Sequence, residues 1–304
     1  MPSTLTELPV VPTASAAPTG ITTAYDGSVW FTENSANKVA RLNPATGAVI
    51  EYSVPTAASA PDQITATPDG NVWFTERYGR HIGRINQAGG AIAEFAVPGT
   101  GAYPTAIATV SGTVWFATAD SAATARLDRI SSTGTITQLA IGATRTTITS
   151  ITGGPDGNLW VTEVSSYWGD AISTVSTAGF GRFTNYRLAN LHAGPQSITV
   201  GADNNLWFTE SGANKIGQIS TAGAIQEFAL AAGSAPQQIV SGPDGALWFT
   251  EKGSNKIGLI TTTGVVTELT ISTASSQPFG ITRGLDGRLW FTEESGDRLG
   301  EIVV

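Results

Sequence analysis

Six glutamates that recur at a regular spacing are the first residues of this sequence that could do chemistry. Each follows a tryptophan by three positions, in segments such as Trp-Phe-Thr-Glu; the six are Glu33, Glu76, Glu163, Glu210, Glu251 and Glu293. Carboxylates bind divalent cations and move protons. A residue repeated around a fold can equally be scaffold, accepting backbone hydrogen bonds or pairing with the basic residue five positions later (Lys38, His81, Lys215, Lys256, Arg298). Both interpretations stay open here.

Histidine is the other side chain of this sequence that could act as a base, and the chain has 2 of them. This number is too small for a site with three histidine ligands. His81 replaces the lysine of a repeated Asn-Lys-Ile-Gly segment, which predicts a structural role. His192 precedes the fifth repeat and could serve as a relocated base, the alternative being a surface histidine without a chemical role. No Ser-His-Asp, phosphate-binding or zinc motif accompanies them.

The elements that must position these side chains are marked by seven tryptophans. Their successive spacings are 43, 42, 45, 47, 41 and 42 residues; they are Trp30, Trp73, Trp115, Trp160, Trp207, Trp248 and Trp290. This is the period of a four-stranded propeller blade. The sequence therefore predicts an all-β fold, a seven-bladed β-propeller with four antiparallel strands per blade.

The segment 61–98 shows the expected blade most clearly. Its first strand ends at a Pro-Asp-Gly turn, and its second, 72–76, is apolar on both faces, as a strand between neighbouring blades should be. The third strand carries a small residue, Gly83. We expect an aromatic ring of the adjoining blade to pack there. The outer strand, 92–95, alternates between apolar and polar residues.

The two ends of the chain are expected to close the ring. The last repeat stops after its third strand, whereas Thr6-Glu7-Leu8 matches a fourth-strand segment such as Thr267-Glu268-Leu269. Residues 1–10 are therefore predicted to complete the blade formed by 276–304, which makes 1–304 a single propeller. Such closure removes open sheet edges.

Composition limits the partners that this chain can have. Charged residues make up 13%, the formal net charge is −8 and no basic run is present, so we expect no nucleic-acid partner. No apolar stretch approaches the roughly 20 residues of a membrane-spanning helix, so we expect no membrane partner. The N-terminus lacks the features of a signal peptide, and both a secreted and a cytoplasmic location stay open. We expect a monomer.

The strand order places the start of each first strand and the end of each second strand on one rim of the central channel. The residues after the first-strand prolines, or their equivalents, are mostly hydroxyls and amides; they are Thr19, Asp62, Thr105, Thr149, Gln196, Gln237 and Phe279. Such groups suit a neutral polar ligand such as a sugar or a peptide. The alternative is a channel mouth lined by solvated polar groups.

An irregular loop of the fourth repeat, 164–170, should lie on the same rim. It contains Tyr167 and Trp168, the one tryptophan outside the repeated set. Together with Tyr78, Tyr103 and Phe279, these rings could form an aromatic platform for a ligand. The alternative is a hydrophobic patch that closes the loop over its own blade, and the solvent exposure of Trp168 distinguishes the two.

The repeats of this sequence resemble those of the virginiamycin B (streptogramin B) lyases over all seven blades. An example is Trp207-Phe208-Thr209-Glu210, followed by Asn214-Lys215-Ile216-Gly217. The resemblance implies the propeller fold and a lyase that opens a depsipeptide ring by elimination across an ester. It also implies a magnesium ion and a histidine base. In the last blade the family has a Glu-Pro-His element and a glutamate that ends the second strand.

The matching residues of this chain are Gln277-Pro278-Phe279 and Glu293, and a second histidine of the family is matched by Gln237. An amide is a weaker cation ligand than a carboxylate, and phenylalanine cannot accept a proton. Two hypotheses remain. The first is a non-catalytic propeller that binds a small molecule, glycan or peptide through Asp62, Gln196, Gln237, Gln277, Phe279, Tyr78, Tyr167 and Trp168. The second is a magnesium-dependent C–O lyase or lactonase with a relocated site, with Glu293 and His192 as catalytic residues and Glu293 and Glu251 as metal ligands.

Overall fold

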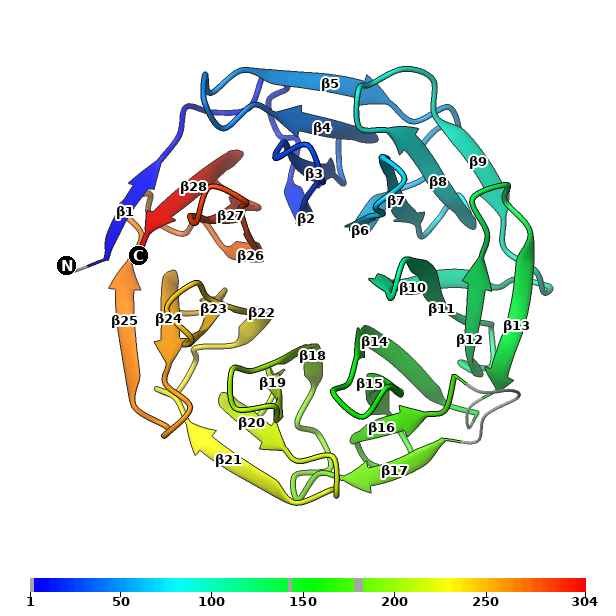
Figure 1. Ribbon diagram of the computed structural model, residues 1–304, viewed down its shortest axis with the longest axis vertical. Helices are drawn as coiled ribbons and strands as arrows, with labels where there is room; N and C mark the ends of the chain where they lie inside the picture. The colour runs from blue at the N-terminus through cyan, green and yellow to red at the C-terminus, as the bar shows by residue number, and fades with distance from the viewer. Residues whose placement is uncertain (1–2, 142–143, 178–182) are drawn as a thin grey trace.

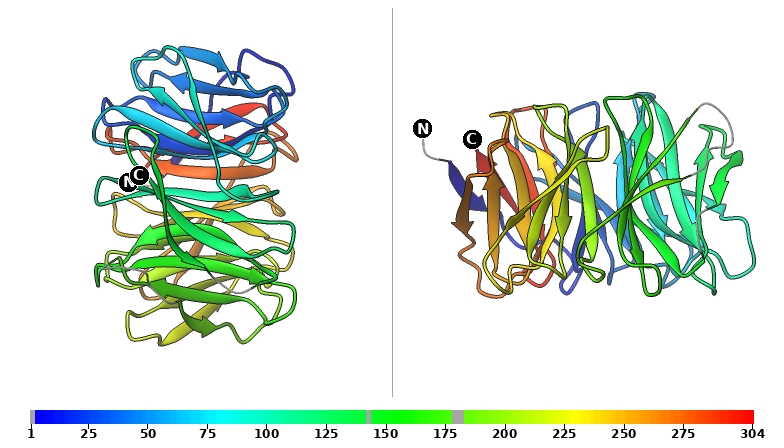
Figure 2. Two further views of the ribbon diagram at one scale, coloured as in Figure 1. Left: turned by 90° about the vertical axis from the view of Figure 1, so that its right-hand side faces the viewer. Right: turned by 90° about the horizontal axis from the view of Figure 1, so that it is seen from below.

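Seven four-stranded antiparallel sheets surround a central channel in the computed structural model of this chain (Figure 1). The structure describes residues 3–141, 144–177 and 183–304, and all of the secondary-structure elements in these ranges are β-strands. The strands run from one face of the ring to the other (Figure 2). The predicted all-β, seven-bladed propeller is therefore confirmed.

The strands of blades 1 to 4 follow one another from the channel outward. Blade 1 has β2 (Pro18–Thr23), β3 (Val29–Glu33), β4 (Lys38–Leu42) and β5 (Val49–Ser53). Blade 2 has β6 (Pro61–Ala66), β7 (Asn71–Glu76), β8 (His81–Asn86) and β9 (Ala93–Ala96). Blade 3 has β10 (Tyr103–Val110), β11 (Thr113–Ala119), β12 (Ala125–Ile130) and β13 (Ile136–Ile141). Blade 4 has β14 (Thr146–Gly153), β15 (Leu159–Ser165), β16 (Ala171–Val175) and β17 (Thr184–Arg187).

Blades 5 to 7 repeat this order. Blade 5 has β18 (Pro195–Val200), β19 (Leu206–Glu210), β20 (Lys215–Ile219) and β21 (Ile225–Ala229). Blade 6 has β22 (Pro236–Ser241), β23 (Leu247–Glu251), β24 (Lys256–Ile260) and β25 (Val266–Thr270). Blade 7 has β26 (Pro278–Arg283), β27 (Leu289–Glu293) and β28 (Arg298–Val303), and its outer strand is β1 (Thr4–Glu7).

The N-terminal strand closes the ring, as the sequence predicted. β1 pairs antiparallel with β28, from Thr4 opposite Val303 to Glu7 opposite Gly300. In Figure 1 the blue β1 lies outside the red β28. Of the expected closing segment, residues 1 and 2 lie outside the described part of the chain.

The repeated tryptophans hold neighbouring blades together. In each blade the tryptophan shares a hydrophobic cluster with residues of the next blade: Trp30 packs with Ile64 and Phe74, and Trp290 packs with Ile21 and Phe31 across the point of closure. Six of the seven have less than 2% of their surface exposed. Large aromatic side chains contribute much of the apolar area that a core buries, so the spacing of tryptophan sets the spacing of the blades.

The small residue of each third strand makes room for a ring of its own blade. A Cβ atom on Gly83 would lie 2.2 Å from Cζ of Phe74, which is on the neighbouring strand β7. The same clash would occur between Gly300 and Phe291. The expectation of a ring from the adjoining blade was therefore wrong, because the phenylalanine of the second strand folds over the strand beside it.

No helix among the described residues is long and apolar enough to cross a membrane.

Candidate functional site

A β-bulge near the start of each innermost strand builds the channel mouth. The pairing register shifts between Pro18 and Ile21 in blade 1 and between Pro278 and Ile281 in blade 7, and every other blade has a shift at the same place. A bulge redirects side chains and is common beside functional sites. The residues singled out after each first-strand proline lie in these bulges.

The threonine of the Trp-Phe-Thr-Glu repeat fixes these bulges. In blade 1 the backbone N–H of Gly20 donates to Oγ1 of Thr32 at 2.9 Å, and this hydroxyl donates to the carbonyl oxygen of Asp62 in blade 2 at 2.6 Å. The hydroxyl of Thr292 donates to the carbonyl oxygen of Thr19 at 2.7 Å, across the closure of the ring. One hydroxyl therefore supports the bulge of its own blade and holds a rim residue of the next.

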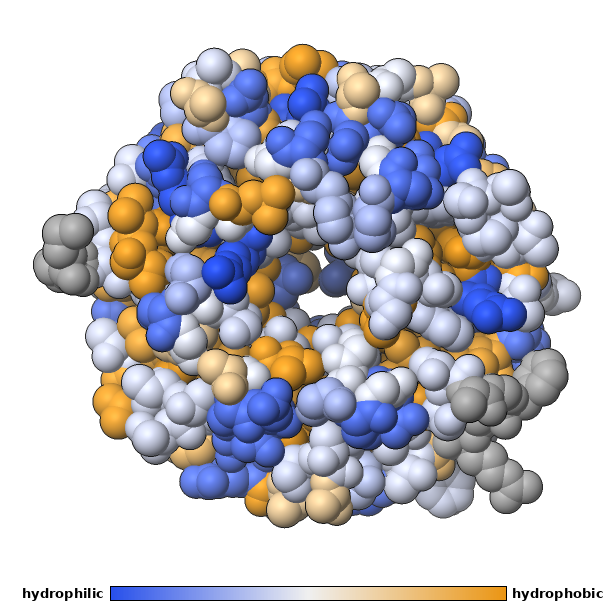
Figure 3. Space-filling model, in the orientation of Figure 1, coloured by the Kyte–Doolittle hydropathy of each residue, from blue (hydrophilic) through white to orange (hydrophobic). Residues whose placement is uncertain are grey.

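Amide side chains converge at a small cavity of the channel. A cavity of about 30 Å³, enough for about one water molecule, is lined by Gln63, Ser150, Gln196, Ser197, Gln237, Gln238 and Phe279. Figure 3 shows the channel as an opening at the centre of the ring. The structure thus brings three of the predicted residues, Gln196, Gln237 and Phe279, to one place.

Sequence reasoning missed Gln63 and Gln238 at this cavity. Both occupy the second position of the bulge, which varies between blades as much as the first position does. Oε1 of Gln238 accepts a hydrogen bond from the N–H of Ile281 at 2.9 Å, and Nε2 of Gln237 donates to Oγ of Ser211 at 3.0 Å. A primary amide can make up to about four hydrogen bonds, so these side chains are held in place with capacity left for a ligand.

Charged side chains of both signs surround the mouth. Nζ of Lys252 lies 2.5 Å from Oε2 of Glu294 and 5.2 Å from the ring centre of Phe279. Asp62 is partly exposed, yet its burial in the channel raises its pKa; Arg77 and Lys252 oppose this rise, and Glu294 adds to it. Four charged groups, those of Asp62, Arg77, Lys252 and Glu294, therefore lie around one opening.

Arg77, Lys252 and Glu294 are further residues that sequence reasoning missed. Each directly follows the glutamate that ends the second strand. The signal was the variation at this position, where the blades have Asn34, Arg77, Ala119, Val164, Ser211, Lys252 and Glu294. The residue at this position differs in every blade. It is therefore not under the structural constraint that keeps glutamate at the preceding position in six blades.

Glu293 lies inside the blade and has no exposed surface. Neither of its carboxyl oxygens has a hydrogen-bond partner within the described ranges. Burial raises its pKa to about 7; the hydroxyl of Ser276 partly opposes this rise, and the negative charge of Glu7 adds to it. Glu33, Glu76, Glu210 and Glu251 are buried in the same way, and Glu163 is 4% exposed.

The lysines of the third strands pair with a different set of glutamates from the one expected. Nζ of Lys38 lies 2.5 Å from Oε2 of Glu51 on β5, and Lys215 pairs in the same way with Glu227 on β21. The expected pairing with Glu33 was wrong, because the half-exposed lysine meets the outer carboxylate, which also accepts a hydrogen bond from Oγ1 of Thr13. Of the expected pairs, Glu76 and His81 do lie within ion-pair distance, at 4.0 Å.

Blade 3 obtains its buried acid from a different strand. Thr118 stands where the other blades have glutamate, and Asp128 occupies the small-residue position of β12. Asp128 is 1% exposed, and burial raises its pKa to about 6. Every blade therefore carries at least one buried acid near this rim, which supports the scaffold interpretation of the repeated glutamates.

The residues present do not fit the magnesium site that the family resemblance implies. Gln277 is exposed, whereas Glu293 is buried beside Glu7. Glu251 belongs to another blade, and its Oε2 accepts a hydrogen bond from Oγ of Ser254 at 2.6 Å. Within the described ranges no three His, Cys, Asp or Glu side chains form a group that could hold a metal ion. We therefore derive no chemistry through magnesium.

The aromatic residues singled out in the sequence lie at separate places on the rim. Tyr167 and Trp168 meet edge to face, with ring centres 4.7 Å apart, and Trp168 is 50% exposed. Tyr78 is 74% exposed, and the ring of Tyr103 carries the guanidinium of Arg77 at 5.3 Å. Among the described residues, Tyr167 and Trp168 are the only two of the five rings in mutual contact.

His192 lies in the turn between β17 and β18. It is exposed, and its backbone N–H donates to Oδ1 of Asn190 at 3.0 Å. His81 lies at the start of β8, with Nδ1 4.0 Å from Oε2 of Glu76. Neither histidine is among the residues that line the channel cavity.

Comparison with known proteins agrees with this architecture. The model of the virginiamycin B lyase family matches residues 3–297. The solved selenomethionine-substituted virginiamycin B lyase from Staphylococcus aureus is 33% identical, with 99% of each chain covered and a TM-score of 0.88. A streptogramin B lyase structure is 31% identical, with 99% of this chain and 97% of that chain covered and a TM-score of 0.88.

A further solved structure bears on the histidine base. It is a catalytically inactive histidine-to-alanine variant of the Staphylococcus aureus virginiamycin B lyase with quinupristin, 33% identical, with 99% of each chain covered and a TM-score of 0.89. No curated protein matches the chain. The family model and these structures span nearly all of the sequence, and the chain belongs to the virginiamycin B lyase family.

Proposed function

We propose that this member of the family binds a small polar ligand at the channel mouth and does not open a depsipeptide ring. The observation that carries the proposal is the side-chain set at the mouth. Gln196, Gln237 and Phe279 converge there, and two of them stand where the family resemblance implies histidines. Amides donate and accept hydrogen bonds but do not move protons at neutral pH.

The related structures support the loss of catalysis. A relative that is 33% identical is catalytically inactive as a variant in which one histidine is replaced by alanine. Here Phe279 stands at the matching position of the Glu-Pro-His element, and its ring carries the ammonium group of Lys252. A phenylalanine with a cation on its ring can hold a ligand but cannot take its proton.

The charges at the mouth favour a peptide with free termini among the polar ligands. Lys252 and Arg77 can meet a carboxylate, while Asp62 and Glu294 can meet an ammonium group. The glutamines can hydrogen-bond the amide backbone between the two termini. A glycan would use the same amides but would offer no opposite charge to Asp62 or Arg77, and charged groups taken from water without partners are costly.

An altered lyase or lactonase is the second candidate, and one observation favours it. The pKa of Glu293 is raised to about 7, which is near the optimum for a general base. However, burial raises the pKa of Glu210 to about 7 as well, and both side chains have no exposed surface. The raised pKa therefore follows from the scaffold, and His192 lies in an exposed turn and is not among the residues that line the cavity.

Calorimetric titration with trialanine at low salt tests the proposal. We expect trialanine with free termini to bind, and its acetylated and amidated form to bind at least about tenfold more weakly. Lys252→Ala should weaken binding by a similar factor, because it removes a cation from the mouth. Lys215→Ala is the matched control, since it removes an equal charge from the outer part of blade 5 and should leave the affinity unchanged.

Two outcomes would contradict the proposal. One is the absence of binding by either form of the peptide. The other is equal binding of the free and blocked forms, because the charged groups at the mouth would then play no part.

A further inference from the structure

Blade 3 has a shorter turn than its neighbours on the face opposite the channel mouth described above. In blade 2, Ala66 pairs with Val72, so five residues form the turn. In blade 3, Val110 pairs with Thr113, so two residues, Ser111 and Gly112, form it. Their φ angles are 50° and 77°. Positive φ at both positions is typical of the tightest hairpin turn.

The short turn leaves the surface hollowed on both of its sides. A cavity of about 540 Å³ lies between blades 2 and 3, and another of about 370 Å³ lies between blades 3 and 4. The larger one is within the usual range of small-molecule sites, roughly 300–1,000 Å³. Blades 2, 4 and 6 have a Pro-Asp-Gly turn at this place, whereas blade 3 has only Ser111 and Gly112.

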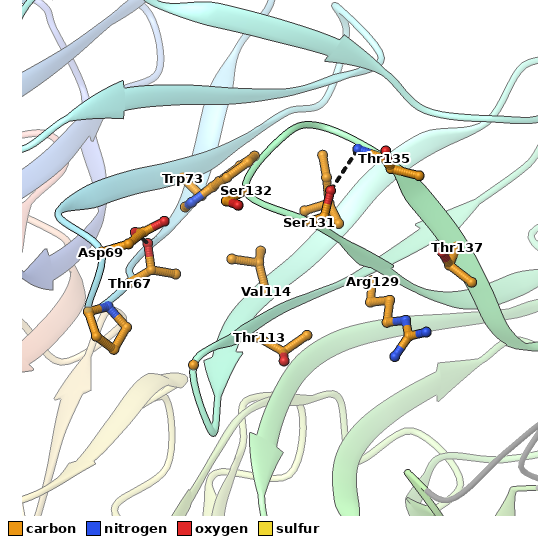
Figure 4. Close-up of a pocket in the computed structure, with 13 residues that line it drawn as sticks. Thr67, Asp69, Trp73, Thr113, Val114, Arg129, Ser131, Ser132, Thr135 and Thr137 are labelled. Carbon is orange, nitrogen blue, oxygen red and sulfur yellow. Dashed lines mark hydrogen bonds between the residues drawn. The ribbon is translucent and has the colours of Figure 1, made fainter.

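Polar and apolar side chains line the larger cavity together, and six of its thirteen residues carry a hydroxyl group. In Figure 4, Asp69 and Trp73 of blade 2 lie on one side and Ser131 and Ser132 of the β12–β13 turn on another, while Thr113 stands near the short turn. Oγ of Ser131 accepts a hydrogen bond from the N–H of Thr135 at 3.0 Å, which fixes this turn. The N–H of the Arg84 guanidinium donates to the carbonyl oxygen of Ser132 and so ties the turn to blade 2.

Trp73 lines this cavity, and its indole N–H is buried without a partner. Trp73 is 1% exposed, and its Nε1 has no hydrogen-bond acceptor among the described residues. In blades 4 to 6 the corresponding N–H donates to the aspartate of the turn, at 3.0 Å from Trp160, 3.1 Å from Trp207 and 3.2 Å from Trp248. Trp290 also lacks a partner, but of the two only Trp73 lines this cavity.

The aspartate of blade 2 is engaged differently. Oδ1 of Asp69 accepts hydrogen bonds from Oγ1 of Thr67 at 2.5 Å and from the N–H of Asn71 at 3.2 Å. The Trp73 indole N–H is therefore an unused donor just beneath the wall, beside a carboxylate. A buried donor without a partner is unfavourable, and a ligand's acceptor atom that reaches it would satisfy it.

We propose that this cavity is a second ligand site and that it takes a neutral sugar. The lining has one carboxylate, Asp69, and one guanidinium, Arg129, so its charges cancel. Asp69 disfavours phosphate and other anions by repulsion. Hydroxyls that can donate or accept, a carboxylate that accepts from neighbouring hydroxyls and one N–H donor complement the hydroxyls of a sugar. The site is independent of the peptide site at the channel mouth.

Nitrogen-15 NMR of the tryptophan side chains tests this site directly. The chain has 8 tryptophans, and the signal of Trp73 can be identified from its loss in Trp73→Phe. The probes are D-glucose, D-galactose and N-acetyl-D-glucosamine, each titrated to about 50 mM, a range suited to weak binding. We expect at least one sugar to shift the Trp73 indole signal in a saturable way and to leave the other indole signals unchanged.

A matched pair of variants checks the location. Ser132→Phe places a ring in the cavity and should weaken the response of Trp73 by at least about tenfold. Thr262→Phe changes the same position of the β24–β25 turn of blade 6, where Thr261 and Thr263 form the same side-chain hydrogen bond as Ser131 and Thr133, and should leave the response unchanged. Unaltered signals of the remaining indoles show that each variant is folded.

Three results would overturn the proposal. The first is the absence of a Trp73 shift with all three sugars in the folded protein. The second is a shift that Ser132→Phe leaves unchanged. The third is a response of Trp73 to trialanine and to none of the sugars.

Discussion

Replacing Glu76 by glutamine tests what the buried acids do to stability. Burial raises the pKa of Glu76 from 4.5 to about 8, and the negative charge of Glu94 adds to the rise. Its carboxyl oxygens have no hydrogen-bond partner within the described ranges, and the nearby basic residue is a histidine, His81, instead of the usual lysine. The folded protein therefore holds a proton on Glu76 that the unfolded chain releases above pH 4.5.

The sign of the effect follows from this difference in proton binding. The stabilising contribution of protonated Glu76 is complete below pH 4.5 and is lost as the pH rises through about 8. Glutamine resembles the protonated acid and does not titrate. This rise in pKa corresponds to about 5 kcal/mol at most, and rearrangement of the surroundings around the ionised group reduces it to about 2 kcal/mol. Glu76→Gln should therefore stabilise the protein at pH 8.5 relative to the wild type.

Urea denaturation at pH 5 and pH 8.5 measures the effect. We expect the variant to unfold with nearly the free energy of the wild type at pH 5 and with about 2 kcal/mol more at pH 8.5. Glu301→Gln is the control, because the carboxylate of Glu301 pairs with Arg288 on the strand surface at 2.7 Å. It should cost less than about 1 kcal/mol at either pH. A variant of Glu76 that is equally or less stable than the wild type at pH 8.5 would refute this account of the buried acids.

Four further predictions follow from the fold and the rim. Deleting residues 1–10 removes β1 from β28 and should lower the melting temperature by about 5–10 °C; an unchanged melting curve would contradict the closure. Thr292→Val removes hydrogen bonds of 2.7 and 2.8 Å at the closure and should cost about 2–3 kcal/mol in urea denaturation, whereas a loss below about 0.5 kcal/mol would show that these bonds do not stabilise the closure. Trp168→Phe should abolish most acrylamide quenching of tryptophan fluorescence, because Trp168 is 50% exposed and the repeated tryptophans are at most 5% exposed; persistent quenching would contradict this. Calorimetric titration with magnesium chloride should show no stoichiometric binding, and Glu293→Gln should not alter the result; a stoichiometric site sensitive to that variant would support a metal-dependent enzyme.

The sequence predicted the fold well because the signals for it are repeated. The tryptophan spacing predicts the seven blades of the ring. The match of Thr6-Glu7-Leu8 to the fourth strands predicts how the ring closes, and β1 pairs with β28 as expected. Strand pairing then places every blade in the same register. Packing between side chains was harder to predict, and the ring that covers Gly83 was assigned to the wrong blade. Sequence spacing fixes which strands are neighbours, but the rotamer of Phe74 decides where its ring lies.

The candidate site was predicted only in part. Gln196, Gln237 and Phe279 were singled out from the first position of the bulge. The charged residues Arg77, Lys252 and Glu294 were not predicted, because each follows a repeated glutamate whose own pattern is the stronger signal. The partner of Lys38 was also wrong, since sequence distance favoured Glu33 and three-dimensional proximity favours Glu51. The residues that differ between blades indicate where a ligand could bind. They have to be compared at every position of the rim, and not only at the first position of the bulge.

The central claim is that this lyase-family propeller binds at its channel mouth without catalysing ring opening. Its most direct test is incubation of the purified protein with quinupristin, the compound present with the inactive relative, in the presence of magnesium, followed by chromatography of the remaining quinupristin. We predict that quinupristin disappears no faster than in a protein-free control. Magnesium-dependent ring opening that is abolished by Glu293→Gln would contradict the account.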